Sequence, residues 1–152
     1  MISTAFNSFN FFRKKESPDY VFHPLNAFQL LKRTYSISKF MERLSKIMPE
    51  LKSVSLNTEF LYKDLTRAYH GLADLHEYVN LDTLDLSKGI IRDLSKNTFY
   101  KAKSKLSLND LLQTAIEARL VGYYEGNVNW LEAALTKAKQ ENKPKKMITD
   151  IK

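Results

Sequence analysis

Three side chains able to bind a metal ion or transfer protons recur at helical spacing in the middle of the sequence. His70, Asp74 and Glu77 stand at positions i, i+4 and i+7, which brings an imidazole and two carboxylates to one side of a helix. That side lies opposite the apolar stripe of the same segment and also carries Lys63 and Arg67. Because such a mixture of charges is typical of a solvated helix face, the sequence favours exposure over a metal site or an acid–base pair.

The rest of the sequence contains no recognisable catalytic or cofactor motif. It has no cysteine, which excludes disulfide bonds and thiolate-ligated zinc. It also lacks a nucleophile elbow, a P-loop, a dinucleotide fingerprint and an HExxH zinc motif. We therefore predict no catalytic residue, no metal ligand and no cofactor, and an enzyme without a known motif stays as an alternative.

Arg119 stands where a helix is expected to present its most apolar side. The surrounding stripe consists of Leu108, Leu111, Leu112, Ala115, Ile116 and Tyr123. A charge left buried and unpaired there would cost several kcal/mol, so the arginine must pair with a carboxylate or reach solvent. The expected partner is Glu132, with Asp85 or Asp93 as alternatives. The alternative is a functional role, in which the Arg119 guanidinium is held in an apolar groove and binds an acidic or phosphate-bearing ligand.

A lysine-rich stretch with two aromatic residues is a candidate polyanion site. Residues 96–105, KNTFYKAKSK, contain four lysines and no acid. The candidate binding residues are Lys96, Phe99, Tyr100, Lys101, Lys103 and Lys105. Lysines can hold phosphates while aromatic rings stack on bases. Basic loops are more often simply solvated, so nucleic-acid or other polyanion binding is the second hypothesis.

Two helices joined by a tight turn are predicted to carry Arg119 and the aromatic residues that follow it. Ser107 stands three residues before Asp110, an acidic variant of the capping-box spacing, and opens a helix over 108–125. Gly126-Asn127 predicts the turn, and a second helix follows over 128–141.

Aromatic residues near this turn are candidates for binding a partner. Tyr124 and Trp130 lie off the local apolar stripe, and with Arg119 and Tyr123 they form the predicted ligand-binding or partner-binding set. The alternative for Trp130 is ordinary packing against a neighbouring helix.

The segment GNVNWLEAALTKA, preceded by Tyr123 and Tyr124, resembles the second half of a tetratricopeptide repeat. In this resemblance Gly126 is the inter-helix turn, Leu131 and Leu135 are packing positions, and Ala138 is the small residue. Leu131 departs from the alanine that the family prefers. The sequence shows no second copy at the family spacing of about 34 residues, so the resemblance implies a helical hairpin without the family's peptide-binding role.

The middle of the chain predicts a central helix with a regular apolar seam. The seam alternates steps of four and three through Leu61, Leu65, Ala68, Leu72, Leu75 and Val79. Asn57 is suited to cap its start and Asn80 its end. A second stripe of Tyr62, Tyr69 and His76 flanks the seam, so this helix is expected to contact neighbours on two sides.

Further helices are predicted on either side of the central one. His23-Pro24 opens the first, and its apolar stripe changes sides near Tyr35, which predicts a break or kink there. Asp82 can cap a helix over 83–95, which Lys96-Asn97 interrupts before a helix resumes.

The predicted fold class is all-α, a single-domain bundle of five or six helices with a C-terminal αα-hairpin. A chain of 152 residues with 43% apolar and 27% charged residues is suited to a globular domain with its own core. We expect a flexible aromatic and basic arm over 1–20, the helical domain over 21–141 and a basic tail over 142–152. No apolar run has the length of a membrane helix.

The predicted function rests on the absence of any catalytic motif in the sequence. A helical chain without a catalytic motif, with 12% aromatic residues, favours a non-enzymatic module that binds a protein partner or a second copy of itself. The absence of cysteine fits a cytoplasmic location. The N-terminal segment MISTAFNSFNFFRKK leaves organelle targeting or secretion open.

Overall fold

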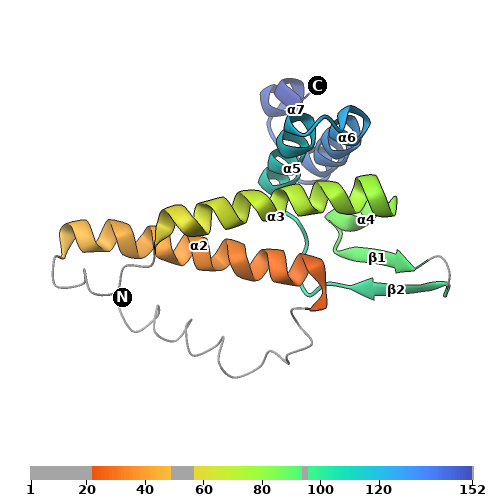
Figure 1. Cartoon of the computed structure of the whole chain (residues 1–152). Helices are drawn as coiled ribbons and strands as arrows, with labels where there is room; N and C mark the ends of the chain where they lie inside the picture. Colours follow the sequence, from red (N-terminus) through yellow and green to blue (C-terminus); the bar gives the residue numbers. More distant parts are fainter. Residues whose placement is uncertain (1–21, 49–56, 94–95, 152) are drawn as a thin grey trace.

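The computed structural model describes residues 22–48, 57–93 and 96–151 and is mostly helical (Figure 1). Its elements in chain order are α2 (Pro24–Ile47), α3 (Thr58–Val79), α4 (Thr83–Ser87), β1 (Ile90–Asp93), β2 (Thr98–Lys101), α5 (Leu108–Leu120), α6 (Tyr124–Gln140) and α7 (Lys145–Ile151). The predicted all-α class is confirmed, with a two-stranded sheet as an addition. The arm predicted over 1–20 lies outside the described residues. Within the described ranges, no helix is both long and apolar enough to span a membrane.

Helix α3 lies at the centre of the fold, as its two apolar stripes predict. Helix α2 runs alongside it on one side, and α5 and α6 pack on the other (Figure 1). The seam is buried at Leu65 and Leu72, but Leu61 and Leu75 are half-buried and Val79 is exposed. The regular seam therefore describes the middle of the helix better than its ends.

Four predicted helix caps are confirmed. Asn57 Oδ1 accepts a hydrogen bond from the third amide of α3, and Asn80 ends that helix in the left-handed conformation with φ 54°. Asp82 caps α4 through its carboxylate. Ser107 and Asp110 form a reciprocal capping box at the start of α5.

Helix α2 is uninterrupted, so the break predicted near Tyr35 is wrong. The polar residues around it fit within the helix because Thr34 and Ser36 donate to backbone carbonyls one turn earlier, at 3.0 and 2.9 Å. The apolar stripe of α2 changes sides where this helix contacts α3, and there the rings of Tyr35 and Tyr62 lie 5.9 Å apart. A continuous neighbouring helix therefore keeps α2 continuous.

The helix predicted over 83–95 is also wrong, because α4 ends at Ser87 and an antiparallel hairpin follows (Figure 1). Gly89, with φ +82°, ends the helical turn, and the two isoleucines of β1 suit an extended strand. Asn97, with φ +50°, lies in the reversal between the strands. Strands of four residues are too short to show a clear alternation in the sequence.

We expect Gly89→Ala to lower the free energy of unfolding by about 2 kcal/mol, measured by urea denaturation. A Cβ at this position would lie 2.8 Å from the backbone oxygen of Ser104, in addition to the strain of its positive φ. The matched control is Gly122→Ala, where φ is +90° but nothing lies within 4 Å of the added carbon. Equal losses in the two variants would show that the contact with Ser104 has no effect.

Helices α5 and α6 form the predicted αα-hairpin, but its turn lies earlier than predicted. Gly122, with φ +90°, occupies the turn, and Gly126 lies inside the first turns of α6. The turn at Gly126-Asn127 is therefore wrong. Gly126 instead allows α6 to approach α3, since a Cβ there would lie 3.3 Å from the His76 ring. The basic tail over 142–152 contains α7, whose Ile148 and Ile151 pack against the core.

Candidate functional site

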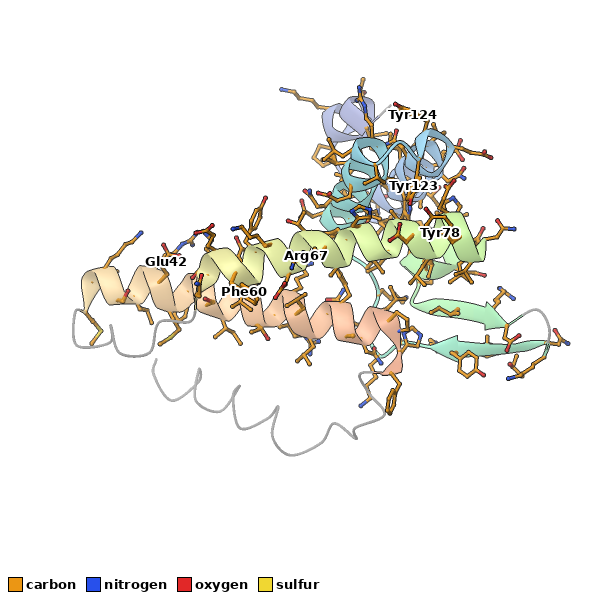
Figure 2. All side chains as sticks on the ribbon, viewed as in Figure 1. Glu42, Phe60, Arg67, Tyr78, Tyr123 and Tyr124 are labelled. Atoms are coloured by element: carbon orange, nitrogen blue, oxygen red, sulfur yellow. The ribbon has the colours of Figure 1, made fainter. Side chains whose placement is uncertain are left out.

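A cluster of tyrosines lies where the C-terminal part of α3 meets the α5–α6 turn (Figure 2). The rings of Tyr78 and Tyr123 meet edge to face, with centroids 5.8 Å apart. Their hydroxyl oxygens are 2.9 Å apart, and the Tyr123 hydroxyl donates to Asp74 Oδ1 at 3.0 Å. Tyr78 is 75% exposed and the adjacent Tyr124 72% exposed. We call Tyr78, Tyr123 and Tyr124 the tyrosine surface.

The hydroxyl group of Tyr123 stays in the neutral form. The hydrogen bond with Tyr78, then burial, and then the Asp74 carboxylate raise the pKa of Tyr123. A protonated phenol remains a hydrogen-bond donor at physiological pH. Sequence reasoning found Tyr123 and Tyr124 but missed Tyr78, because it lies 45 residues from its partner and belongs to no motif.

Asp110 is a buried carboxylate in the first turn of α5. It is fully buried, and its Oδ1 accepts from Lys32 Nζ at 2.6 Å and from the Tyr69 hydroxyl at 3.0 Å. Its Oδ2 accepts from the Ser107 backbone and side chain at 2.8 and 2.7 Å. Burial raises the pKa of Asp110, but the hydrogen bonds from Lys32 and Ser107 outweigh it, and the net pKa is below its usual value. This carboxylate therefore links α2, α3 and α5.

Arg119 is exposed, so the prediction that it occupies the apolar face of its helix is wrong. Helix α5 is rotated so that its small residues, Ala115 and Ala118, face the core. Alanines of α6, the helix that packs against α5, are buried as well (Ala133, Ala134 and Ala138), and small side chains permit close approach of helices. Of the expected stripe, Leu108, Leu111 and Ala115 are buried as predicted, whereas Ile116 is exposed.

Two of the three carboxylates proposed as partners of Arg119 have other partners. Asp85 pairs with Arg92, and Asp93 lies 3.9 Å from Lys96 Nζ. Among the described residues, no ion pair includes Arg119 or Glu132. Of the two expectations for Arg119, pairing with a carboxylate or reaching solvent, the structure shows the second. Its role in ligand binding stays a prediction.

Trp130 is fully buried and lies in the core, which agrees with packing against a neighbouring helix. Its ring meets the His76 ring edge to face at 6.3 Å. A partner therefore cannot contact Trp130 on the surface of this structure, and it is corrected from a candidate anchor to a core residue. Tyr124, in the same helix, stays on the surface.

The candidate residues of the lysine-rich stretch all lie on or beside the β1–β2 hairpin. Phe99, Tyr100 and Lys101 belong to β2, whose residues are all exposed. Lys96 precedes β2, and Lys103 and Lys105 follow it, all exposed. The structure thus brings the six predicted residues to one region, but as a strand and its flanks instead of a helix.

The candidate metal face of α3 is largely open to solvent, as predicted. His70 Nε2 lies 3.9 Å from Asp74 Oδ1, with both side chains about two-fifths exposed, and Glu77 is exposed. Within the described part of the chain, no group of three metal-ligating side chains is arranged to hold an ion.

The fold and the tyrosine surface are compatible with a helical protein-interaction module. The family model for the prolyl 4-hydroxylase alpha-subunit, N-terminal region, matches residues 6–93. Because this match covers more than half of the chain, the protein belongs to that family. The matched residues include α2, α3, α4 and β1, and the hairpin resembling a tetratricopeptide repeat follows them.

Two curated relatives match most of the chain. Prolyl 4-hydroxylase subunit alpha-2 of Caenorhabditis elegans is 32% identical over 136 residues, covering 84% of this chain and 24% of the relative. Prolyl 4-hydroxylase subunit alpha-1 of Mus musculus is 28% identical over 131 residues, covering 83% of this chain and 23% of the relative. The chain therefore spans about a quarter of the length of these relatives. No solved structure matches the chain significantly.

Proposed function

We propose that this chain is a non-enzymatic interaction module that holds a proline-containing polypeptide on the tyrosine surface. The relatives are named as alpha subunits of prolyl 4-hydroxylase, an activity directed at prolyl residues. The observation that carries the proposal is the exposure of Tyr78 and Tyr124 beside the fixed ring of Tyr123.

The chemistry of this surface suits proline. Proline-rich segments adopt the extended polyproline II helix, which docks into aromatic-lined surfaces with little loss of conformational entropy. Proline has no amide hydrogen, so the carbonyl oxygens of such a segment need donors. The exposed Tyr124 supplies a hydroxyl donor beside an apolar ring face, and the hydrogen bond that Tyr123 donates to Asp74 keeps the Tyr123 ring in place.

A fluorescein-labelled decaproline peptide tests this proposal by fluorescence anisotropy. We expect Tyr78→Ala to weaken binding by about tenfold, because the variant removes an exposed ring that contacts the peptide. Tyr62→Ala is the matched control, since Tyr62 is also exposed on α3 but lies away from the cluster.

Two results would count against the proposal. One is an equal loss of affinity in the Tyr62→Ala and Tyr78→Ala variants, which would show no preference for the tyrosine surface. The other is equally tight binding of a glycine-serine peptide of the same length, which would show that proline is not recognised.

A further inference from the structure

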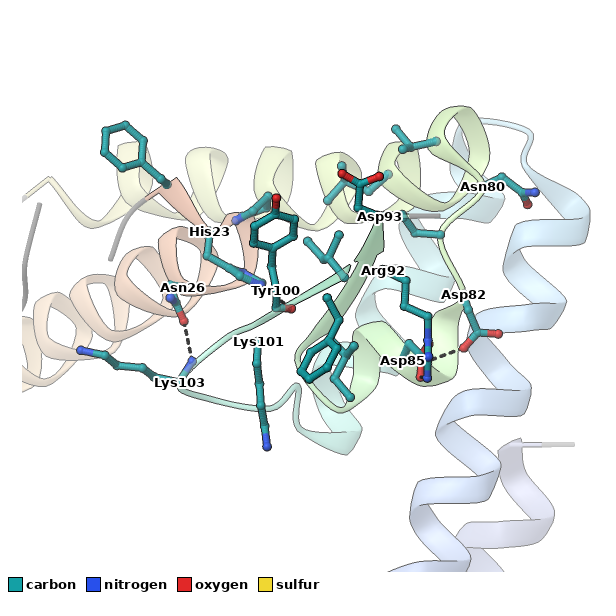
Figure 3. Close-up of a pocket in the computed structure, with 18 residues that line it drawn as sticks. His23, Asn26, Asn80, Asp82, Asp85, Arg92, Asp93, Tyr100, Lys101 and Lys103 are labelled. Atoms are coloured by element: carbon teal, nitrogen blue, oxygen red, sulfur yellow. Dashed lines mark hydrogen bonds and ion pairs between the residues drawn. The ribbon is translucent and has the colours of Figure 1, made fainter. Parts of the chain in front are cut away.

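A cleft of about 1140 Å³ lies between the start of α2, the end of α3 and the β1–β2 hairpin (Figure 3), and no residue of the tyrosine surface lines it. Its apolar lining includes Leu75, Val79, Leu81, Ile90, Ile91 and Phe99. Phe99 is 66% exposed and Val79 58% exposed, so part of this apolar lining is accessible to a ligand. A cleft of this size exceeds the usual range for a small-molecule pocket and suits a segment of polypeptide.

Hydrogen bonds hold the hairpin against α2 and so fix the walls of the cleft. The backbone N–H of Lys103 donates to Asn26 Oδ1 at 3.0 Å, as Figure 3 shows. The His23 ring lies 3.4 Å from the Tyr100 carbonyl oxygen through its Nε2 atom. A cleft whose walls are tied together is preorganised for binding.

Strand β2, which forms one edge of the two-stranded sheet, lines this cleft through Phe99, Tyr100 and Lys101. The amide of Ala102 donates to the carbonyl of Gly89, and the register continues with Ile91 opposite Tyr100. In an antiparallel ladder with this register, the backbone groups of Phe99 and Lys101 point away from β1. Among the described residues, no backbone hydrogen bond from another segment pairs with this edge. Such an edge can accept an extended chain as a further strand.

The charge along this edge is positive. Lys101 and Lys103 line the cleft beside β2, and residues 96–105 contain no acid. Of the acidic residues of the cleft, Asp85 pairs with Arg92, and Asp93 lies in β1 opposite Thr98 and 3.9 Å from Lys96 Nζ. A ligand next to β2 therefore meets lysines, and carboxylates on it would complement them.

We propose that this cleft binds an extended acidic segment of a polypeptide, which adds as a third strand to β2. Alternate side chains of the segment enter the apolar lining, and its carboxylates lie beside Lys101 and Lys103. The observations favour a peptide over a nucleic acid, because a strand edge pairs with backbone amides, which a phosphodiester chain lacks.

The test uses a fluorescein-labelled octapeptide that alternates glutamate with valine, measured by anisotropy against the full chain. We expect Lys101→Glu to weaken binding by about tenfold, because it reverses a charge beside the bound carboxylates. The matched control is Lys139→Glu, an exposed lysine of α6, which should leave the affinity unchanged. Both variants are first compared with the native chain by thermal unfolding.

N-methylation of the peptide tests the strand addition itself. In an added strand only alternate amides pair with β2, so methylating one alternate set should weaken binding by about tenfold and methylating the other set should not. Equal effects of the two methylated peptides would overturn strand addition. No binding of the octapeptide at millimolar concentration would overturn the site.

Two further measurements separate this cleft from other surfaces. Single-stranded oligothymidine that binds more tightly than the octapeptide, and loses affinity in Lys101→Glu, would overturn the peptide assignment in favour of nucleic acid. Tyr78→Ala should leave octapeptide binding unchanged, and Lys101→Glu should leave decaproline binding unchanged, so failure at one surface is distinguishable from failure at the other.

Discussion

Replacing Asp110 with asparagine should lower the free energy of unfolding by about 3 kcal/mol, measured by urea denaturation followed by circular dichroism. The carboxylate is fully buried and accepts hydrogen bonds from Lys32, Tyr69 and Ser107. Asparagine keeps the volume but removes the charge that balances Lys32, and its amide group presents a donor where an acceptor is needed. Three helices lose their common contact in this variant.

The matched control is Asp64→Asn, the same substitution in an ion pair on the surface. Asp64 pairs with Arg67 at 3.3 Å, and the arginine side chain is 76% exposed. An exposed pair contributes about 0.5 kcal/mol or less, so this variant should retain nearly native stability. A loss at Asp110 no larger than that at Asp64 would show that the buried network contributes nothing.

The pH dependence of stability should differ between the native chain and Asp110→Asn. The pKa of Asp110 is lowered in the folded state, so its contribution is complete above the unfolded value of about 3.9. That contribution is lost as the pH falls below this value and through the lower folded pKa. The native chain should therefore lose more stability than the variant on acidification in this range. Parallel curves of unfolding free energy against pH would contradict a stabilising role of the Asp110 carboxylate.

Trp130→Ala should lower the free energy of unfolding by about 4 kcal/mol, because it removes the largest fully buried side chain and leaves a cavity between helices. The indole nitrogen has no hydrogen-bond partner among the described residues, so the loss comes from packing and not from a polar contact. Thermal unfolding followed by circular dichroism measures the effect.

Two further variants test whether burial of the Trp130 side chain is the reason for this loss of stability. Tyr124→Ala removes another aromatic ring from α6, but one that is 72% exposed, and should change stability by about 0.5 kcal/mol or less. Trp130→Phe keeps an apolar ring and should lose less than Trp130→Ala, which also keeps the experiment interpretable if the alanine variant does not fold. A larger loss in Tyr124→Ala than in Trp130→Ala would contradict the placement of both residues.

The parts of the fold that sequence reasoning predicted correctly depend on local signals. The caps at Asn57, Asn80 and Ser107 need only a side chain within a few residues of the amides it satisfies, or a residue that tolerates the left-handed conformation. The buried middle of α3 follows from a repeat of leucines within one helix. Such signals do not depend on which neighbour a helix contacts.

The predictions that were wrong concern features that depend on which neighbouring segment a helix or strand contacts. The predicted stripe around Arg119 correctly contained Leu108, Leu111 and Ala115, but it also contained Ile116, which is exposed, and it placed Arg119 where the neighbouring Ala118 is buried. The hairpin lacked a readable alternation within its four-residue strands. The tyrosine surface and the cleft both join segments distant in the chain, so no local pattern could predict either site.

The hydrogen bonds that fasten α2 have a consequence for the order of folding during synthesis. Its contacts reach far along the chain: Asn26 binds Lys103 across 77 positions and Lys32 binds Asp110 across 78. At a translation rate of about 5 to 20 residues per second, the ribosome needs roughly 4 to 16 s to supply the second partner after the first. During that time α2 can pack against α3 but lacks its hydrogen bonds to Lys103 and Asp110, so a chaperone that binds nascent chains can act on this helix before those bonds form.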